Sequence, residues 1–253
     1  TQVKKTMEIV ENTGRAQEDR SRWEPALGAI PDRIWSRGAP RLGAHLHFVQ
    51  GRAAFELARL GAVTSPGELL QEARSDLEQA RQLDPNNAQV YRYLAEVFVR
   101  EGEAAAARGN QDEKEAAERQ ADELLAEAVR AAGDTPEAHI NVLLRKLATA
   151  QRAGITAARE QMKTLEPQFE ALARKFPTSG PVFAALGQFH ALYAAYLDSA
   201  GGKEELQRAI QAAEQAGLRD KGNAEYALLT ASYYYRRYSV YGETAALDQA
   251  VEL

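Results

Sequence analysis

The sequence predicts an all-α protein, a solenoid of antiparallel helix pairs. Two series of residues with helical spacing recur along the chain and stay in step with each other. The composition also suits a globular protein with a core, because 45% of the 253 residues are hydrophobic and 26% are charged.

The first series begins with a bulky residue. An apolar, a small and a long or aromatic residue follow three, four and seven positions later, which places all of them on one face of an α-helix. The series starts at positions 47, 91, 139, 183 and 227, so its intervals are 44, 48, 44 and 44 residues. Its small residues would let two helices approach closely, and they are Gly51, Ala95, Gly187 and Ala231.

The second series marks the other helix of each pair and its end, usually at Pro or Gly. It starts at positions 73, 121, 165 and 209, with intervals of 48, 44 and 44 residues, so it repeats the one longer interval of the first series. Together the series predict helices over 44–60, 67–83, 87–107, 111–132, 136–152, 155–175, 180–199, 203–216, 223–239 and 244–253.

Turn and capping residues separate these helices. Asp84-Pro85-Asn86-Asn87 and Phe176-Pro177-Thr178-Ser179-Gly180 are typical of a turn followed by a new helix start. Asp134-Thr135-Pro136 is typical of an N-cap with proline early in the helix. Gly201-Gly202-Lys203 is interpreted as a turn between helices, because the strand and glycine spacing of a phosphate loop are missing.

These residues resemble the tetratricopeptide repeat, in which a bulky–Leu–Gly–aromatic helix alternates with a helix that carries Ala, an aromatic residue, Ala and a closing Pro. The resemblance covers about residues 44–253, with an incomplete last repeat, and it implies a right-handed superhelix. The period here exceeds the usual length of about 34 residues and overlaps HEAT and armadillo repeats, which are the alternative. The extra residues lie between the two signatures and would lengthen both helices by about one and a half turns.

Residues 1–43 carry neither series. We expect them to form an N-terminal capping segment over the apolar face of the first repeat, with a short helix near 2–12. Both tryptophans of the chain, Trp23 and Trp35, fall in this segment. The chain starts at Thr1 and stops inside a helical pattern at Leu253, so we expect it to be part of a longer polypeptide that could form a homo-oligomer through an open C-terminal repeat.

Several kinds of site are not expected. The absence of cysteine excludes disulfides, thiol nucleophiles and thiolate zinc sites. A net charge of −5 argues against nucleic-acid binding, and the apolar runs are too short to span a membrane. The acidic run at 112–127 is interpreted as a solvated helix face. No metal, cofactor or catalytic residue is expected, because the four histidines do not cluster; they are His45, His47, His139 and His190, the last two packed or partly buried.

The resemblance implies that the first helix of each pair lines a concave binding surface. Arg52, Arg92 and Arg100 could bind a carboxylate there. The alternative is pairing within one helix, such as Arg92 with Glu96 four residues on. The predicted partner-binding residues are Arg52, Phe55, Arg92, Glu96, Arg100, Leu144, Gln188, Leu192, Tyr235 and Arg236.

A group of tyrosines lies near the end of the chain. The repeat pattern places Tyr234 in the core, but the consecutive Tyr233, Tyr234 and Tyr235 cannot all face inward. Those that face outward are candidates for partner contacts, since tyrosine offers a large contact area at a small entropy loss.

The sequence therefore predicts a non-catalytic scaffold or adaptor module that binds proteins or peptides. One alternative is a regulatory or sensor arm of a larger enzyme. Another is a helical-repeat RNA-binding module, which the acidic charge balance disfavours.

Overall fold

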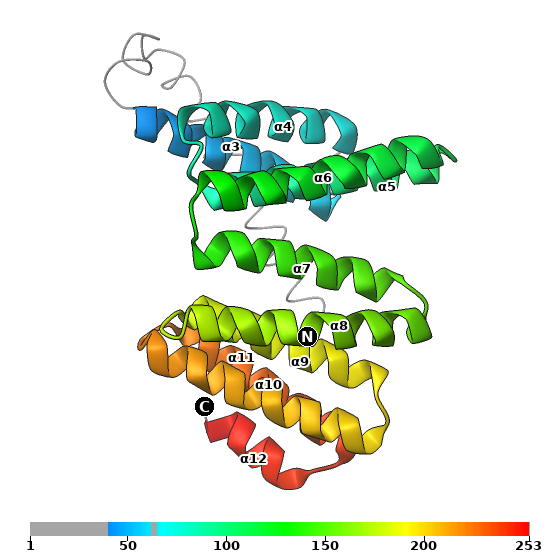
Figure 1. Ribbon diagram of the computed structural model, residues 1–253, viewed down its shortest axis with the longest axis vertical. Coiled ribbons are helices and arrows are strands. Elements are labelled where there is room, and N and C mark those ends of the chain that lie inside the picture. Colours follow the sequence, from blue (N-terminus) through cyan, green and yellow to red (C-terminus); the bar gives the residue numbers. More distant parts are fainter. Residues whose placement is uncertain (1–39, 62–64, 253) are drawn as a thin grey trace. The chain divides into compact units, whose positions relative to one another are not determined.

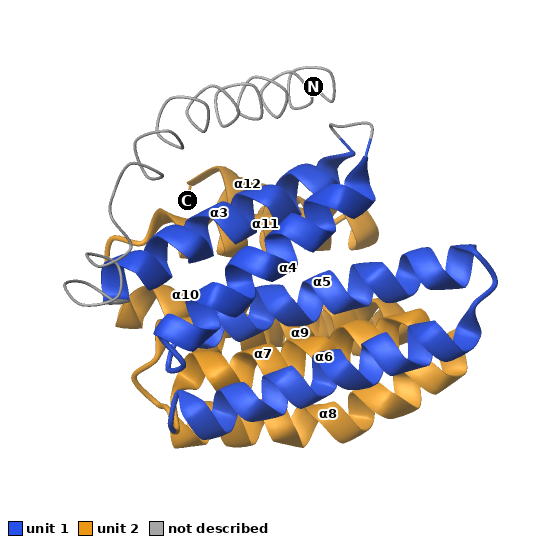
Figure 2. Ribbon diagram, turned by 90° about the horizontal axis from the view of Figure 1, so that it is seen from above, with its two compact units in different colours: residues 1–133 blue, residues 134–253 orange. Residues whose placement is uncertain are grey.

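The computed structural model describes residues 40–61 and 65–252, and all regular secondary structure within these residues is α-helix or 3₁₀ helix (Figure 1). The chain divides into two compact units, residues 1–133 and 134–253, which Figure 2 shows in separate colours. The predicted capping segment, including its short helix and both tryptophans, lies almost wholly outside the described residues. Its last four residues instead belong to the first described helix, which begins at Pro40.

The described part of the first unit contains two helix pairs. Their members are α3 (Pro40–Leu60) with α4 (Pro66–Leu83), and α5 (Ala88–Ala107) with α6 (Gln111–Ala131). Helix α5 packs against α4 and also contacts α3, so the first helix of one pair reaches both helices of the pair before it.

The second unit contains three helix pairs and repeats this packing. Its elements are α7 (Pro136–Arg152), α8 (Ile155–Lys175), α9 (Gly180–Tyr193), a 3₁₀ turn (Ala194–Tyr196), α10 (Ser199–Arg219), α11 (Ala224–Tyr241) and α12 (Thr244–Glu252). Helix α9 contacts both α7 and α8, and α11 contacts both α9 and α10. The chain therefore has an all-α repeat fold of antiparallel helix pairs, and this prediction is confirmed.

The connection between α9 and α10 differs from its prediction. A helix was expected over 180–199, but α9 ends at Tyr193 and α10 begins at Ser199. The cause is an N-cap, since the Asp198 side chain accepts a hydrogen bond of 2.9 Å from the Gly201 amide. The sequence Gly201-Gly202-Lys203 thus lies in the first turn of α10 and does not form a turn between helices.

The second series forms the core as predicted. Ala73, Leu77 and Ala80 on α4 are 0% exposed, and so are Ala209, Ala213 and Ala216 on α10. The corresponding residues of the other two copies are buried as well, and they are Ala121, Leu125, Ala128, Leu165, Phe169 and Leu172. Helices α4, α6, α8 and α10 therefore each bury the face that carries the second series.

The glycines of the first series lie where two helices touch. A Cβ atom added to Gly51 would come within 2.7 Å of Leu77 Cγ and 2.9 Å of the Ala73 carbonyl oxygen on α4. A Cβ atom on Gly187 would lie 3.0 Å from the Ala209 carbonyl oxygen on α10. The close approach predicted from these small residues is confirmed at both positions.

We expect Gly51→Ala to destabilise the protein by about 1–2 kcal/mol. Overpacking against α4 costs about 1–3 kcal/mol, and the better helix propensity of alanine, about 1 kcal/mol, offsets only part of it. Gly217→Ala on α10 is the matched control, because the nearest atom would lie 3.9 Å from the new methyl group. That control should be neutral or stabilising in urea denaturation, and equal stability of the two variants would contradict the close helix contact.

Candidate partner-binding surfaces

Three of the predicted binding residues lie in the first unit around an aromatic side chain that the sequence did not single out. The guanidinium of Arg92 lies over the ring of Tyr93 at 4.4 Å from the ring centroid, and that of Arg52 lies over it at 5.6 Å. Phe48 meets the same ring edge-on at 5.7 Å. We call Phe48, Arg52, Arg92 and Tyr93 the Arg–Tyr cluster. It joins α3 to α5, and stacking on the ring holds both guanidinium groups in place.

Ion pairing within one helix, the alternative considered from the sequence, is found at two of the three arginines. Arg100 donates a 2.9 Å hydrogen bond to Glu103, whereas Arg92 and Glu96 approach only to 3.8 Å. Burial raises the pKa of Glu96, and the nearby Arg92 opposes this effect. Arg52 and Arg92 therefore lie together, while Arg100 pairs further along α5.

The placement of Phe55 on the binding surface was wrong. Its side chain is 1% exposed and packs edge-on against Tyr93 at 5.8 Å between ring centroids. The resemblance placed it by repeat register alone. The structure instead places this side chain in the core, between α3 and Tyr93 of α5.

The predicted binding residues of α7 and α9 differ in accessibility. Leu144 and Leu192 are only partly buried, but both pack against the core that α7, α8 and α9 share. Gln188 is exposed. Their part in binding stays a prediction.

The tyrosines of α11 divide between core and surface. Tyr233, and not Tyr234, occupies the core: it is 7% exposed, and burial raises its pKa far above the ordinary value. Tyr234 is half-buried and its hydroxyl donates a 3.1 Å hydrogen bond to Glu214. Tyr235 is 57% exposed and contacts the ring of Tyr238, with Arg236 half-buried beside it. Tyr235 thus faces outward, and its part in binding stays a prediction.

The first series carries only a partial signal for the burial of Tyr233. Tyr233 lies six residues after position 227, where the last copy of the series starts, and the same position holds Val97 in α5 and Phe189 in α9 but Arg145 in α7. Val97 and Phe189 are 0% exposed, whereas Arg145 is partly exposed, so the packing of the helices decides that Tyr233 is buried.

A groove runs along the start of α11 where it meets the end of α10. Its volume is about 660 Å³, and its lining is mostly apolar, with Tyr226, Ala227 and Thr230 contributed by α11. Leu218, which also lines it, is 61% exposed. This groove is a second accessible surface. It could not be predicted from the sequence, because its walls come from two different helix pairs.

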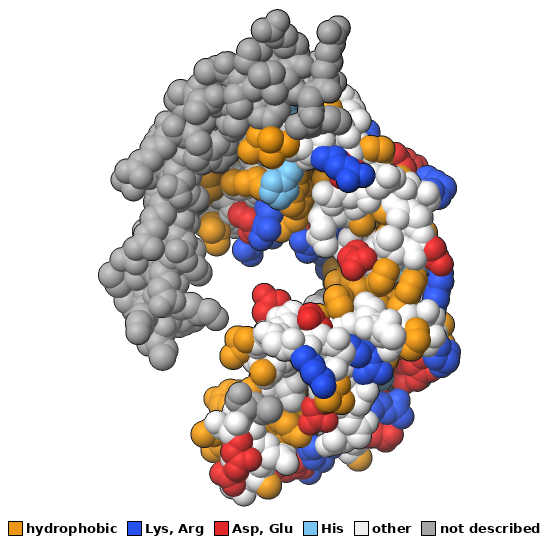
Figure 3. Space-filling view, turned by 90° about the vertical axis from the view of Figure 1, so that its left-hand side faces the viewer, with side chains coloured by type: hydrophobic (Ala, Val, Ile, Leu, Met, Phe, Trp, Pro, Cys, Tyr) orange, Lys and Arg blue, Asp and Glu red, His pale blue; other side chains and the backbone are white. Residues whose placement is uncertain are grey.

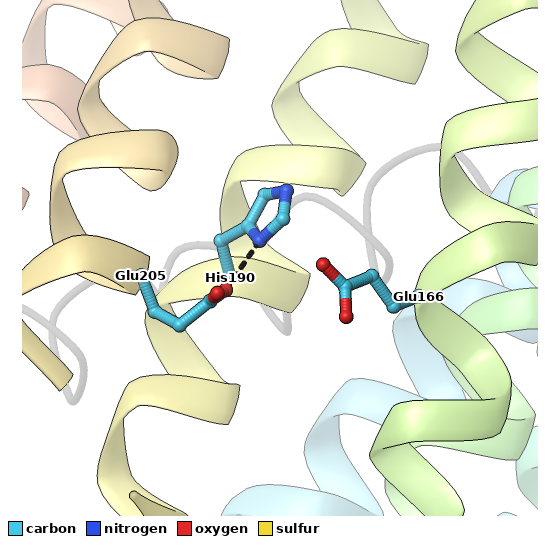
Figure 4. A group of neighbouring side chains, drawn as sticks. All are labelled: Glu166, His190 and Glu205. Carbon is cyan, nitrogen blue, oxygen red and sulfur yellow. Dashed lines mark hydrogen bonds and ion pairs between the residues drawn. The ribbon is translucent and has the colours of Figure 1, made fainter. Parts of the chain in front are cut away.

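One polar cluster lies inside the second unit. His190 on α9 is 4% exposed, in keeping with the packed position predicted for it, and its Nδ1 lies 2.6 Å from Glu205 Oε2 on α10. Glu166 on α8 approaches the same imidazole, as Figure 4 shows. Arg208 donates a 2.8 Å hydrogen bond to Glu166 and lies 3.4 Å from Glu205. Sequence spacing could not predict this grouping, because its members are on three helices.

The charged surface shows no continuous basic stripe on the face seen in Figure 3, where lysines and arginines lie among acidic and hydrophobic side chains. The acidic run on α6 is largely exposed. Some of its members pair within the helix, such as Glu115 with Arg119 at 4.0 Å, and others pair with another helix, such as Glu127 with Arg81 of α4 at 3.3 Å. Among the described helices, none is both long enough and apolar enough to cross a membrane.

The fold and these surfaces define a helical-hairpin repeat protein. No family model and no curated protein matches the chain. Among solved structures it is similar to YrrB, described as a TPR protein with an unusual peptide-binding site, at 16% identity and a TM-score of 0.37 over 79% of this chain and 84% of that one. It is also similar to MamA 41-end from Desulfovibrio magneticus RS-1, at 15% identity and a TM-score of 0.41 over 83% and 94% of the two chains.

A second MamA structure is similar at 13% identity and a TM-score of 0.38, covering 83% of this chain and 91% of that one. These superpositions are too loose, and the identities too low, to assign the chain to a family.

Proposed function

We propose that this chain is a non-catalytic scaffold module that binds a protein or peptide partner, and that the Arg–Tyr cluster receives a carboxylate of that partner. The observation that carries the proposal is the position of Arg52 and Arg92. They come from different helices, yet both guanidinium groups stack on one tyrosine ring.

This arrangement suits a peptide carboxylate for two reasons. Stacking on Tyr93 uses the faces of the guanidinium groups and leaves their edges for hydrogen bonds. The charge of Arg92 is only weakly paired within the protein, since its ion pair with Glu96 is 3.8 Å long and both side chains are partly exposed. Phe48 adds an apolar surface next to the two charges, so the peptide should carry an apolar or aromatic residue near its carboxylate.

The test is a selection from a library of displayed peptides with free C-termini, with the full 253-residue chain as bait. The dissociation constant of an enriched peptide would then be measured by fluorescence anisotropy. Arg52→Ala and Arg92→Ala should each weaken binding about tenfold or more, since a hydrogen bond to a charged group contributes about 1.5–3 kcal/mol. Arg92→Lys should restore only part of the loss, because lysine keeps the charge but lacks the planar edge.

The matched control is Arg119→Ala on α6, in the same unit. Its side chain is 68% exposed, and its ion pair with Glu115 is long, at 4.0 Å. Loss of binding in this control, or unchanged binding in both Arg52→Ala and Arg92→Ala, would contradict the proposal.

A further inference from the structure

The polar cluster inside the second unit combines three side chains that are common metal ligands. Glu166, His190 and Glu205 each offer one ligand atom, and these atoms all lie within 4.8 Å of one another. They come from three successive helices, α8, α9 and α10, and they converge from different directions (Figure 4). We propose that they bind a divalent first-row transition-metal cation such as Zn²⁺. This proposal replaces the expectation, drawn from the sequence, that the chain has no metal ligands.

Burial distinguishes this cluster from an ordinary surface ion pair. The side chains of His190 and Glu205 are 6% and 8% exposed, whereas that of Glu166 is 24% exposed. Two ligands are therefore anchored in the interior of the unit, and the third faces solvent, from which a cation could arrive. A buried carboxylate needs compensation by a cation or by hydrogen bonds, because its desolvation is costly.

The local charge also favours a cation. Three carboxylates, those of Glu166, Glu204 and Glu205, contact a single guanidinium, that of Arg208. Three carboxylates and one guanidinium leave these four side chains with a net charge of −2. The pKa of the neighbouring Tyr193 is raised by burial and, next in size, by the charge of Glu166, which is consistent with a negative potential at this point.

Arg208 shows where a cation is accommodated. Its Nη1 lies 2.8 Å from Glu166 Oε1 and 3.4 Å from Glu205 Oε1, so it bridges the two carboxylates. The side chain is 42% exposed and also pairs with Glu204 at 3.0 Å on the outside of α10. It can therefore leave the two carboxylates and keep one partner, which makes the guanidinium and a metal ion competitors for the same place.

The distances require only side-chain adjustments. With metal–ligand bonds of about 2.0–2.2 Å, tetrahedral ligands lie about 3.3–3.6 Å apart. His190 Nδ1 and Glu205 Oε2, now 2.6 Å apart, would have to separate by about 0.7–1.0 Å, and ligand atoms as far as 4.8 Å apart would have to approach by about 1.2–1.5 Å. One imidazole with two carboxylates favours Zn²⁺, Mn²⁺ or Co²⁺ over Ca²⁺, which takes six to eight oxygen ligands.

The experiment uses the full chain after removal of metal with EDTA. Titration with ZnCl₂ in a calorimeter should show one equivalent of bound Zn²⁺, and Co²⁺ should produce visible absorption bands of a coordinated ion. Glu166→Gln should weaken Zn²⁺ binding at least tenfold, since even the loss of outer partners of metal ligands typically costs 10–100-fold. Arg208→Gln should tighten binding, because it removes the competing guanidinium.

Glu166→Gln is the principal variant because its side chain is partly exposed, and its circular dichroism should match that of the unaltered chain. Glu160→Gln is the matched control on the same helix, with a side chain that is 64% exposed and pairs with Lys163. It should leave the affinity unchanged. Absence of Zn²⁺ binding, binding unaffected by Glu166→Gln, or an affinity not increased by Arg208→Gln would each overturn the proposal.

Discussion

Ala95→Glu is expected to destabilise the protein by about 3–5 kcal/mol, because it places a charge without a partner inside the first unit. Ala95 is 3% exposed and takes the small-residue position of the first series in α5. Because almost none of its surface is exposed, the larger glutamate side chain would have to displace the residues packed around it. The free energy of unfolding from urea denaturation measures the effect.

Ala104→Glu is the control for this substitution. It lies on the same helix, it is exposed, and the new carboxylate would lie four residues before Arg108. Such a pair stabilises a helix by about 0.2–0.5 kcal/mol. If Ala95→Glu unfolded at the same urea concentration as this control, the repeat register derived above would be incorrect.

Glu205→Ala is expected to cost a similar amount, about 3–5 kcal/mol, when measured in the presence of EDTA. The substitution leaves the buried His190 without its 2.6 Å partner and removes one of the carboxylates that Arg208 contacts. Removing one partner of a buried hydrogen bond costs far more than losing an exposed ion pair, because the remaining partner stays desolvated. Urea denaturation again provides the measurement.

The adjacent Glu204 supplies the control. Its side chain is 67% exposed and pairs with the same Arg208 at 3.0 Å. Glu204→Ala should change the free energy of unfolding by no more than about 0.5 kcal/mol, as is usual for exposed pairs. Equal effects of the two substitutions would show that burial of the cluster contributes nothing to stability.

The helices were predictable because their signals are local. Spacings of three, four and seven residues fix which side chains share a helix face, and caps such as Asn87, whose side chain accepts a hydrogen bond from the Gln89 amide at 3.1 Å, fix where helices begin. Six of the ten predicted helices agree with the observed ones to within one residue at each end. Helix α3 begins four residues earlier than predicted, α10 begins four residues earlier and ends three later, and α11 ends two residues later. The end of α9 was missed by more, because the N-cap at Asp198 was not recognised.

The candidate site was less predictable than the fold. Arg52 and Arg92 were expected to act together, and the structure does bring them to one surface. Tyr93, which organises them, was not foreseen, and Phe55 was assigned to the surface although it is buried. Repeat register states which face of a helix a residue occupies. It does not state how far that helix is rotated against its neighbours.

The sequence by itself determined the helices, their pairing and the small residues at which paired helices meet, since each of these depends on residues within about two helical turns or on a repeated interval. The tertiary structure alone decided that Tyr233 is buried in place of Tyr234, that two arginines share one ring, and that Glu166, His190 and Glu205 meet inside one unit. Consecutive residues on a helix point about 100° apart. A rotation of one helix against its neighbours by less than a third of a turn therefore exchanges a buried side chain for an exposed one.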